Sequence, residues 1–393
     1  MESPPSTLLE LLERSSSLAV LSQPAEDLGV AETVPFPFLA IVGQLELKIA
    51  MLLGLTNPRI GGILLTGPRG TGKTTIVRSL TDLLPHTLRS ICPYGCTEEA
   101  VEEWGMDAIC PDCAVLYGQG KPLTAPDRVR LIELPLNARM EDVVGGIDER
   151  IAIEQKRVRL RRGILSQADQ NILYVDEINL LNNAVADAIL DAAAQGRYTV
   201  RRGPLRMTYR SRLMLIGSMN PEEGELRPQI MDRFGLRVVV QGIEDHSQRM
   251  EIYRRTRAYL EHPHAMTAQW AEETRLAAAE VERARNLLPQ VELDSVVAQV
   301  GLQLIRQLGI QSHRAEFTLF EAVRAHAALD ARSVADLEDL GVAAPMALRQ
   351  RRSAFMRGFI EQKTKEDREI QAALNATIKH QETRPVPTEA QES

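Results

Sequence analysis

Aromatic residues are scarce in this sequence, making up only 4% of its 393 residues, although 44% of the chain is hydrophobic. The core must therefore be filled mainly by Leu, Ala, Ile and Val, which is typical of a helix-rich protein. Long apolar runs are absent as well, and this excludes a membrane-spanning helix. The N-terminal stretch carries acidic side chains where a signal peptide would carry positive charge. We expect a cytoplasmic protein with no membrane contact.

Positive charge is also in deficit, with 46 Lys and Arg against 53 Asp and Glu and a net charge of −7. General nucleic-acid binding usually needs a basic surface, so this balance argues against it. Two local basic stretches, Lys156–Arg162 and Arg201–Arg212, are most simply solvated faces. The second could also bind a partner protein, whereas DNA binding is the least favoured interpretation.

The order of apolar patterns divides the chain into four parts. Residues 1–34 are rich in Ser, Pro and Glu and are expected to form a flexible leader. Residues 35–243 alternate short apolar runs with helical patterns, which predicts a doubly wound α/β domain with a parallel sheet. Residues 244–357 predict a smaller all-helical domain, and residues 358–393 are polar and expected to be disordered. Within the α/β part, the spacing predicts helices over 44–55, 73–84, 148–162 and 183–194, strands over 62–66, 131–134, 171–175, 213–216 and 236–240, and a hairpin over 198–208.

A glycine-rich turn follows the first predicted strand and opens the next helix. Its sequence, Gly67-Pro-Arg-Gly-Thr-Gly-Lys-Thr74, matches G-x-x-x-x-G-K-[ST], in which backbone N–H groups surround phosphates without side-chain obstruction. In this pattern Lys73 reaches the β- and γ-phosphates and Thr74 ligates Mg²⁺. The position between an apolar strand and an amphipathic helix argues against a chance glycine turn. The residues expected to contact the nucleotide are Gly67, Pro68, Arg69, Gly70, Thr71, Gly72, Lys73, Thr74 and Thr75.

Two other predicted strands end in polar residues. The run Ile172-Leu-Tyr-Val delivers Asp176 and Glu177 to the carboxyl edge of the sheet, where doubly wound sheets bind ligands. Asp176 is expected to hold Mg²⁺ together with Thr74, and Glu177 to polarise the attacking water. Asn220 follows the strand predicted over 213–216. It orients the same water, touches the γ-phosphate or forms a simple turn with the next residue, and these interpretations stay open. The predicted activity is hydrolysis of MgATP.

With these residues in place, the chain resembles the ATPase subunit of magnesium chelatase, a ring-forming ATPase of the AAA+ superfamily. The resemblance runs from Pro35 to about Arg352. Its most specific segments are Asn220-Pro-Glu-Glu-Gly-Glu-Leu-Arg-Pro-Gln229 and Asp232-Arg-Phe-Gly235, because the phosphate loop is shared by many ATPases. Other matching segments are Phe36–Gln44, Asn57–Gly62, Asp142–Asp148, Ile172–Leu181 and Ala347–Arg352.

The resemblance implies an AAA+ nucleotide domain, a helical lid and a ring, expected to be a hexamer, with ATP between subunits. Arg233 stands where the family has its arginine finger, although a surface salt bridge is the alternative. Arg314 resembles the second-sensor arginine of the lid, acting on its own nucleotide or on a neighbour's, and Arg227 is a weaker interface candidate. The segments Val143–Ile147 and Tyr198–Met207 resemble the family's helix insert and its hairpin, both on the pore or partner face.

The resemblance also implies a role for the hydrolysis. It would drive a partner subunit that inserts Mg²⁺ into protoporphyrin, without contact between this chain and the porphyrin. A remodelling ATPase of the related MoxR type, paired with a von Willebrand A domain protein, is the alternative, and a DNA-acting motor is less favoured.

The cysteines are confined to one short stretch, with the spacing C-x3-C-x13-C-x2-C. Two close pairs can present four thiolates to one tetrahedral ion, which predicts a structural Zn²⁺ site in an insert over 92–113. Free thiols, a redox disulfide and an iron–sulfur cluster are the other interpretations, and a reducing cytoplasm disfavours the disulfide. Four cysteines at this place are not a general mark of magnesium chelatases, so the insert departs from the family pattern. The expected ligands are Cys92, Cys96, Cys110 and Cys113.

Overall fold

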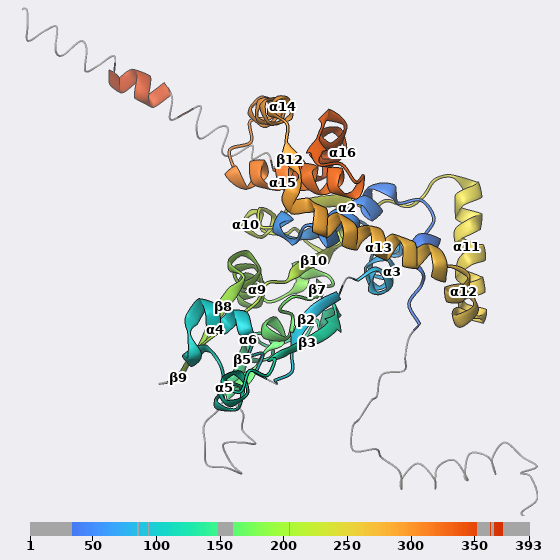
Figure 1. Cartoon of the computed structure of the whole chain (residues 1–393). Helices are drawn as coiled ribbons and strands as arrows, with labels where there is room; N and C mark the ends of the chain where they lie inside the picture. Colours follow the sequence, from blue (N-terminus) through green and yellow to red (C-terminus); the bar gives the residue numbers. More distant parts are fainter. Residues whose placement is uncertain are drawn as a thin grey trace, which may run out of the picture.

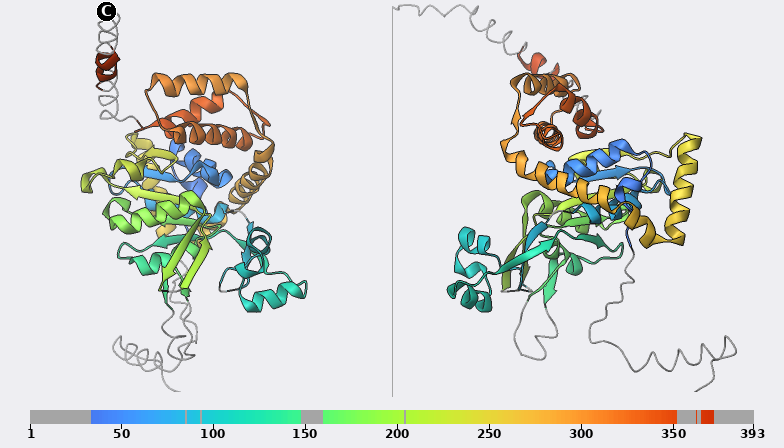
Figure 2. Two further views of the ribbon diagram at one scale, coloured as in Figure 1. Left: turned by 90° about the vertical axis from the view of Figure 1, so that its left-hand side faces the viewer. Right: turned by 45° about the vertical axis from the view of Figure 1, so that its right-hand side comes forward.

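The computed structural model describes residues 34–84, 86–92, 94–147, 160–203, 205–351, 362 and 365–371. The expected leader, most of the helix predicted over 148–162 and the end of the chain lie outside these residues. Figure 1 shows the central sheet in the middle of the molecule, with the C-terminal helices on one side and the cysteine-bearing insert at the opposite end. The two further views in Figure 2 show the same separation.

Five parallel strands form the central sheet. Every residue of the three inner strands is buried, because helices cover both faces and each strand is a continuous apolar run. One strand continues to Met219, beyond its predicted end at Ile216, because its last residues pair with the first strand. The observed arrangement confirms the α/β fold class. In spatial order the strands are β11 (Leu236–Val239), β1 (Ile63–Thr66), β10 (Met214–Met219), β7 (Ile172–Val175) and β4 (Leu131–Leu134).

Different helices cover the two faces of this sheet. Ile63 of β1 packs in one core cluster with α2 (Leu45–Thr56) and α3 (Lys73–Ser79). Leu64, the next residue, points to the other face and packs with α9 (Asn183–Gln195). The helices predicted over 44–55 and 183–194 are confirmed. The helix predicted over 73–84 is shorter, because its last turn continues as a 3₁₀ helix over Leu80–Leu83.

One predicted helix is wrong in its described part. Residues Leu160–Arg162 form the strand β6, which pairs antiparallel with β5 (Gly145–Ile147). The two strands approach very closely at a glycine: a Cβ atom at Gly145 of β5 would lie 2.3 Å from the Arg161 carbonyl oxygen of β6. Such an approach depends on glycine at a position far away in the chain, which helical periodicity does not register.

Two further strand pairs leave the sheet. The predicted hairpin is confirmed as β8 (Arg197–Arg202) and β9 (Leu205–Arg210), paired in register. The insert is carried by the antiparallel strands β2 (His86–Ser90) and β3 (Thr124–Arg128). Between them lie α4 (Glu98–Trp104), η4 (Met106–Ala108) and α5 (Pro111–Gly118).

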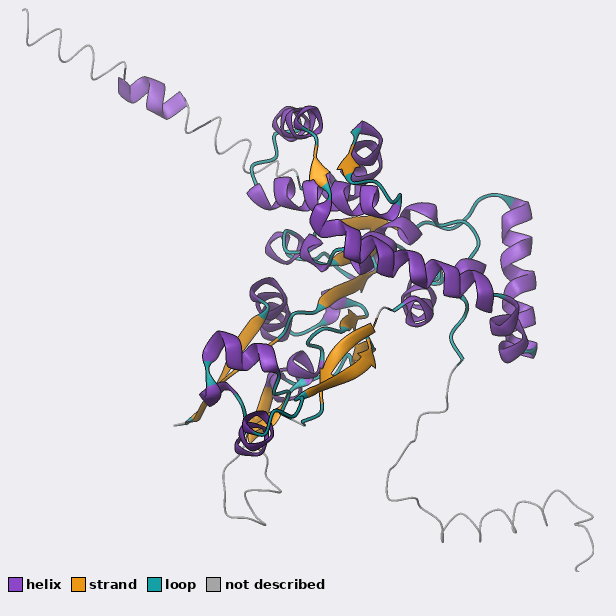
Figure 3. Cartoon of the chain, viewed as in Figure 1, coloured by secondary structure: helices purple, strands orange, loops and turns teal. Residues whose placement is uncertain are grey.

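The C-terminal part is helical, as predicted, apart from a pair of two-residue strands (Figure 3). Its elements are α11 (His246–Glu261), α12 (Pro263–Gln269), α13 (Ala271–Leu287), η7 (Leu288–Gln290), β12 (Glu292–Leu293), α14 (Ser295–Gln307), α15 (His313–Leu329), β13 (Val334–Ala335) and α16 (Leu337–Leu348). No helix among the described residues is long and apolar enough to cross a membrane. The remaining short elements are η1 (Phe38–Ala40), η2 (Pro58–Ile60), α6 (Met140–Val144), α8 (Ile164–Gln167), η5 (Ile178–Leu180), η6 (Pro221–Glu223) and α10 (Pro228–Met231).

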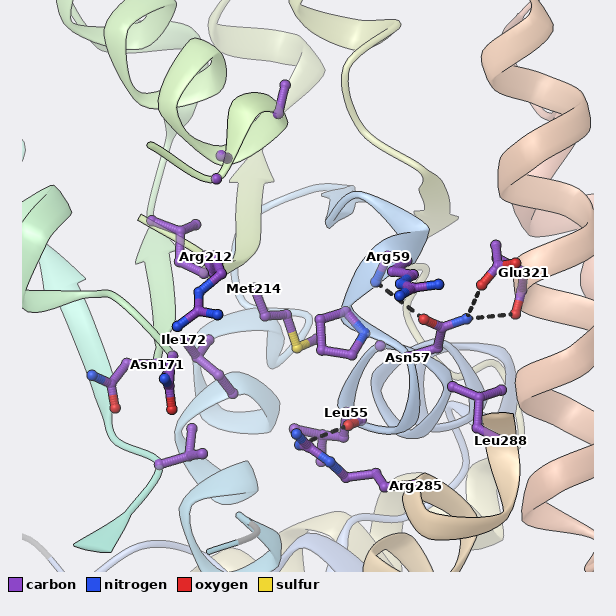
Figure 4. A pocket seen from close by; sticks show the side chains of 18 of the residues that line it. Leu55, Asn57, Arg59, Asn171, Ile172, Arg212, Met214, Arg285, Leu288 and Glu321 are labelled. Carbon is purple, nitrogen blue, oxygen red and sulfur yellow. Dashed lines mark hydrogen bonds between the residues drawn. The ribbon is translucent and has the colours of Figure 1, made fainter. Parts of the chain in front are cut away.

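A buried polar contact joins the helical part to the nucleotide domain. The Asn57 side-chain amide donates to Glu321 of α15, at 2.7 Å to the carboxylate and 3.2 Å to the carbonyl oxygen. Figure 4 shows this contact beside a groove of about 800 Å³ at the amino edge of the sheet. In the same view Arg285 donates to the Leu55 carbonyl oxygen. None of the residues predicted to bind nucleotide lines this groove.

Part of the polar tail has structure where the sequence predicted none. Residues 365–371 are helical and exposed. Lys365 and Glu369, spaced i,i+4, approach to 3.9 Å, and such pairs support an exposed helix. The polar composition that suggested disorder is equally compatible with a solvated helix.

Candidate active site

The glycine-rich turn joins the carboxyl end of β1 to α3. Its backbone is attached to the sheet, because the Gly67 N–H donates to the Met219 carbonyl oxygen at 3.1 Å. A Cβ atom at Gly67 would lie 2.1 Å from the Val240 carbonyl oxygen, so only glycine fits there. Gly70 and Gly72 have φ of +77° and +85°, the left-handed region that glycine adopts without strain. The turn therefore has the curved backbone that a phosphate-binding loop needs.

The Lys73 side chain turns back into this loop. Its Nζ donates to the carbonyl oxygens of Gly67 and Pro68, at 2.7 and 2.8 Å. Burial lowers the pKa of Lys73, and the nearby carboxylates, Asp176 first among them, act in the opposite direction. The amine lies at the centre of the loop, where phosphate oxygens would accept the same hydrogen bonds. The other predicted loop residues surround it: exposed Pro68, Arg69, Gly70 and Thr75, and half-buried Thr71 and Gly72.

Thr74 and Asp176 meet as the sequence predicted. The Thr74 hydroxyl donates to Asp176 Oδ2 at 3.3 Å. Two neighbours orient this carboxylate: Tyr174 donates to Oδ1 at 2.9 Å, and Ser218 donates to the same oxygen. Burial raises the pKa of Tyr174 to about 12, so it acts as a neutral donor. A hydroxyl and a carboxylate at this distance are the hard oxygen ligands that Mg²⁺ prefers, so the donor set fits that ion.

Glu177 is held in an unusual backbone conformation. Its φ is +48°, in the left-handed region, which costs a residue with a side chain about 1–2 kcal/mol. The Glu177 N–H donates to Ser218 Oγ at 3.1 Å, so one hydroxyl orients both acidic residues. The Glu177 side chain is 25% exposed, and its carboxylate lies 3.4 Å from the guanidinium of Arg69 in the loop. Strain of this kind is often found at functional sites.

Asn220 lies at the same edge, immediately after β10. It is buried, and its amide donates to Glu223 Oε1 at 2.9 Å while its Oδ1 accepts the Glu222 N–H at 3.3 Å. Glu223 also forms an ion pair with Arg69. Asn220 therefore shapes the turn and is linked to Glu177 through Glu223 and Arg69, so none of its interpretations is eliminated.

Sequence reasoning missed Tyr174, Ser218 and Glu223. Tyr174 was hidden inside an apolar run, as one more bulky residue of a buried strand. Ser218 had a usable signal, since it is a polar residue inside the apolar strand β10, two residues before Asn220. Glu223 occurs in a run of acidic residues that gave no reason to select one of them.

Arg233 lies at the amino edge of the sheet, opposite the loop. The segment that carries it is attached where β1 begins, because the Gly235 N–H donates to the Gly62 carbonyl oxygen at 3.1 Å. Arg233 forms an ion pair with Asp191 of α9, and 27% of its side chain is exposed. The arginine predicted to contact a nucleotide is therefore separated from the loop of its own subunit by the length of the sheet.

Arg227 pairs with the same helix one turn earlier, at 3.1 Å from Asp187. Among the described residues, Arg227 makes no contact with the loop.

Asp232 connects the Arg233 segment to the lid. Its carboxylate accepts hydrogen bonds from Arg351 at 3.0 Å and from Ser312 at 3.3 Å. The Arg314 guanidinium lies 3.9 Å from the same carboxylate. The Arg351 side chain is only 1% exposed and also donates to the carbonyl oxygens of residues 234 and 235. Arg314 and Arg233 thus stand on the same side of the subunit, and neither lies near its own phosphate loop.

The four cysteines converge on one point. Their Sγ atoms all lie within 4.8 Å of one another, with Cys92 and Cys110 at 3.6 Å. Backbone N–H groups point at two of the sulfurs: Tyr94 donates to Cys92 at 3.3 Å and Cys110 to Cys96 at 3.2 Å. Burial and the neighbouring thiols raise the pKa of Cys96 to about 12. A cation would relieve this repulsion between thiolates, so the donor set fits a tetrahedral metal ion.

Two family models match the chain. The ATPase family associated with various cellular activities matches residues 63–241, and the AAA lid domain matches residues 302–373. The first covers the sheet with the phosphate loop and both acidic residues. The second begins within α14 and extends into the polar tail.

Curated relatives match over most of their length. The magnesium-chelatase 38 kDa subunit of Acidiphilium rubrum is 40% identical over 318 residues, which is 80% of this chain and 90% of the relative. A magnesium-chelatase subunit homologue of Methanocaldococcus jannaschii is 38% identical over 323 residues, 81% and 87% of the two chains. Among solved structures, a putative ATPase from Cytophaga hutchinsonii is similar with a TM-score of 0.52 at 18% identity, over 80% of this chain and 84% of that one. This last likeness bears on the fold alone.

Proposed function

The chain belongs to the family of magnesium-chelatase ATPase subunits, and from this premise we propose that it is the motor of a magnesium chelatase-like complex. In that complex a partner subunit would insert Mg²⁺ into a porphyrin. The observation that carries the proposal is the 40% identity to a magnesium-chelatase subunit over 90% of that subunit's length. The convergence of Lys73, Asp176 and Glu177 at one edge of the sheet supports the ATPase activity on which such a motor depends.

In this proposal each residue at the carboxyl edge has a defined task. Lys73 and the loop N–H groups bind the β- and γ-phosphates. Lys73 then donates to phosphate oxygens instead of to the carbonyl oxygens of Gly67 and Pro68. Thr74 and Asp176 would hold Mg²⁺, which supplies positive charge on the phosphate oxygens. Glu177 accepts a proton from, or orients, the attacking water. Asn220 would help to position the same water.

The arginines at the opposite edge would serve a neighbouring subunit. A four-residue strand spans about 13 Å, so Arg233 stands across the sheet from its own loop. Arg314 lies beside Asp232, the residue before Arg233, and so it also stands at the amino edge of the sheet. Both would therefore complete the site of the next subunit, which requires a closed ring, proposed here as a hexamer.

The cysteine insert would hold a structural Zn²⁺ in the reducing cytoplasm. Protein purified without added zinc is then expected to contain about one zinc per chain, measured by elemental analysis of reduced, folded protein. Cys110→Ser should lose most of this zinc, whereas Asp112→Asn, an exposed change inside the second cysteine pair, should retain it. Zinc near zero in folded protein contradicts the assignment, and iron with sulfide in its place identifies an iron–sulfur cluster.

Capture of partners from native lysate tests the proposed function itself. The Glu177→Gln variant, loaded with MgATP, should retain the assembled ring because hydrolysis is blocked. A large porphyrin-binding subunit among the captured proteins is the expected result. Recovery of a von Willebrand A domain protein alone would instead identify a remodelling ATPase of the MoxR type. Salt-sensitive retention of DNA by the same variant would identify a DNA-acting motor.

A further inference from the structure

Arg210, at the end of β9, joins the hairpin to the cysteine insert. Its guanidinium donates to Thr97 Oγ1 at 3.2 Å and to the carboxylates of Glu99 and Glu103, each at 2.8 Å. It also lies over the ring of Trp104, 5.1 Å from the ring centroid. Only 9% of the Arg210 side chain is exposed, although β9 belongs to a hairpin that leaves the sheet. Four groups of the insert therefore surround one cation.

The position of these four groups depends on the cysteines. Thr97 follows Cys96 directly and caps α4, because its hydroxyl accepts the Ala100 N–H at 3.2 Å. The carboxylates and the ring that contact Arg210 all lie on α4. Among the described residues of the insert, the core that supports this helix has a few fully buried members, Cys96, Ala100, Ile109, Cys113 and Leu123, with partly buried side chains packed against them. A core of this size contributes little stability alone, so bonds from a metal to the sulfurs would supply most of the order of the insert.

A second contact ties the first cysteine pair to the neighbouring strand β6. Gly95 lies against the guanidinium of Arg162, since a Cβ atom at Gly95 would come within 2.6 Å of both its terminal nitrogens. Arg162 in turn donates to the hydroxyl and the carbonyl oxygen of Ser166, both at 2.6 Å. Leu160 of β6 packs against Tyr209 of the hairpin. The insert therefore touches the base of the hairpin both directly and through β6.

The hairpin has reason to need this support. An isolated two-stranded ribbon is only marginally stable. Here Arg201 and Arg206 stand directly opposite each other in the ladder, and both are exposed. Like charges at such a pair weaken a ribbon further. Arg210 lies on the same face, four ladder pairs further from the tip than the Arg201–Arg206 pair, and there the carboxylates of α4 compensate the charge.

From these contacts we propose that the metal-bearing insert fixes the β8–β9 hairpin on the ATPase domain, with Arg210 as the positioning residue between them. The proposal rests on the zinc occupancy proposed above. With the metal bound, α4 presents two carboxylates and an aromatic ring to Arg210 at fixed positions. Without it, α4 loosens and leaves a largely buried guanidinium with fewer partners, which is unfavourable. The hairpin then loses its fixed attachment while the phosphate loop, on the other side of β10, keeps its structure.

Amide hydrogen exchange of the full chain tests this coupling. Removal of zinc with a chelator under reducing conditions should speed exchange of the β8–β9 amides about tenfold or more, and added zinc should restore it. Arg210→Ala should give the same acceleration while its zinc content stays near that of the wild type. In that variant, removal of zinc should add little further at the hairpin, because the direct contact with α4 is already lost and the contact through β6 is expected to contribute less. Arg206→Ala, an exposed change on the same strand, should respond to zinc as the wild type does. The exchange rate of the hairpin amides in Arg210→Lys should lie between those of the wild type and Arg210→Ala.

Three outcomes would overturn the proposal. Zinc removal could speed exchange in α4 and α5 while the hairpin amides stay unchanged, which would separate the insert from the hairpin. Arg210→Ala and zinc removal could instead give additive effects, which would show that Arg210 is not the connection. Protein that holds no zinc removes the premise, and elemental analysis identifies that failure before exchange is measured. Basal ATPase activity, followed in parallel, reports separately on the proposed motor function.

Discussion

Replacing Glu177 by Gln is expected to leave ATP binding intact and to lower turnover by a factor of about 10²–10⁴. The factor is what a positioned general base typically contributes. Binding should persist because Gln has the same shape and the groups that contact phosphate, Lys73 and the loop backbone, are unchanged. The Asp176 carboxylate also keeps its donors Tyr174 and Ser218. Nucleotide affinity measured by fluorescence titration, together with steady-state phosphate release, would separate the two effects.

A matched control is available close by. Glu222 is exposed, two residues after Asn220, and Glu222→Gln removes the same charge near the site. Its turnover should stay within about twofold of the wild type, as for most exposed changes. If Glu177→Gln hydrolysed ATP at the rate of this control, Glu177 would not be the residue that activates water.

The second expected result concerns Arg233. Arg233→Ala should lower turnover by a factor of about 10³ or more, the effect typical of an arginine finger. The ATP affinity of an isolated subunit should hardly change, since Arg233 stands across the sheet from its own loop. Arg227→Ala is the matched control: that arginine pairs with the same helix α9, and its loss should reduce turnover far less.

Mixing the two inactive variants tests the trans arrangement directly. In a random equal mixture of Arg233→Ala and Glu177→Gln subunits, about a quarter of the sites would combine an intact Glu177 with an intact Arg233 from the next subunit. Turnover should therefore rise from near zero to about a quarter of the wild-type value, with its maximum at equal amounts. Turnover that stays near zero at every mixing ratio would argue that Arg233 acts within its own subunit, or that it stabilises the fold without contacting nucleotide.

Much of the nucleotide domain could be predicted from the sequence because its signals are local. The strands β1 and β7 are unbroken apolar runs, and the loop glycines occur in a fixed pattern between a strand and a helix. Parallel topology then places Asp176 beside Thr74 without further information. The cysteine pairs could also be expected to meet, because their spacing alone limits where the sulfurs lie.

The remaining features depend on contacts between distant segments. The strand β6 was expected to be helical because its ladder with β5 requires glycines nearly twenty residues apart. Arg210 belonged to a basic stretch that is usually a solvated face, and only the fold reveals the carboxylates of α4 around it. The position of Arg314 beside Asp232 could not be predicted for the same reason, since it depends on where α15 packs.

The buried side chain of Arg351 has a mechanical consequence. It donates to Asp232, which precedes Arg233, and to the carbonyl oxygens of the two residues that follow Arg233. These hydrogen bonds attach the end of the lid to the segment that carries Arg233. A rotation of the lid would therefore move the guanidinium of Arg233 together with the lid. In the ring proposed above, a change at one nucleotide would then alter the activation barrier for hydrolysis at the adjacent one.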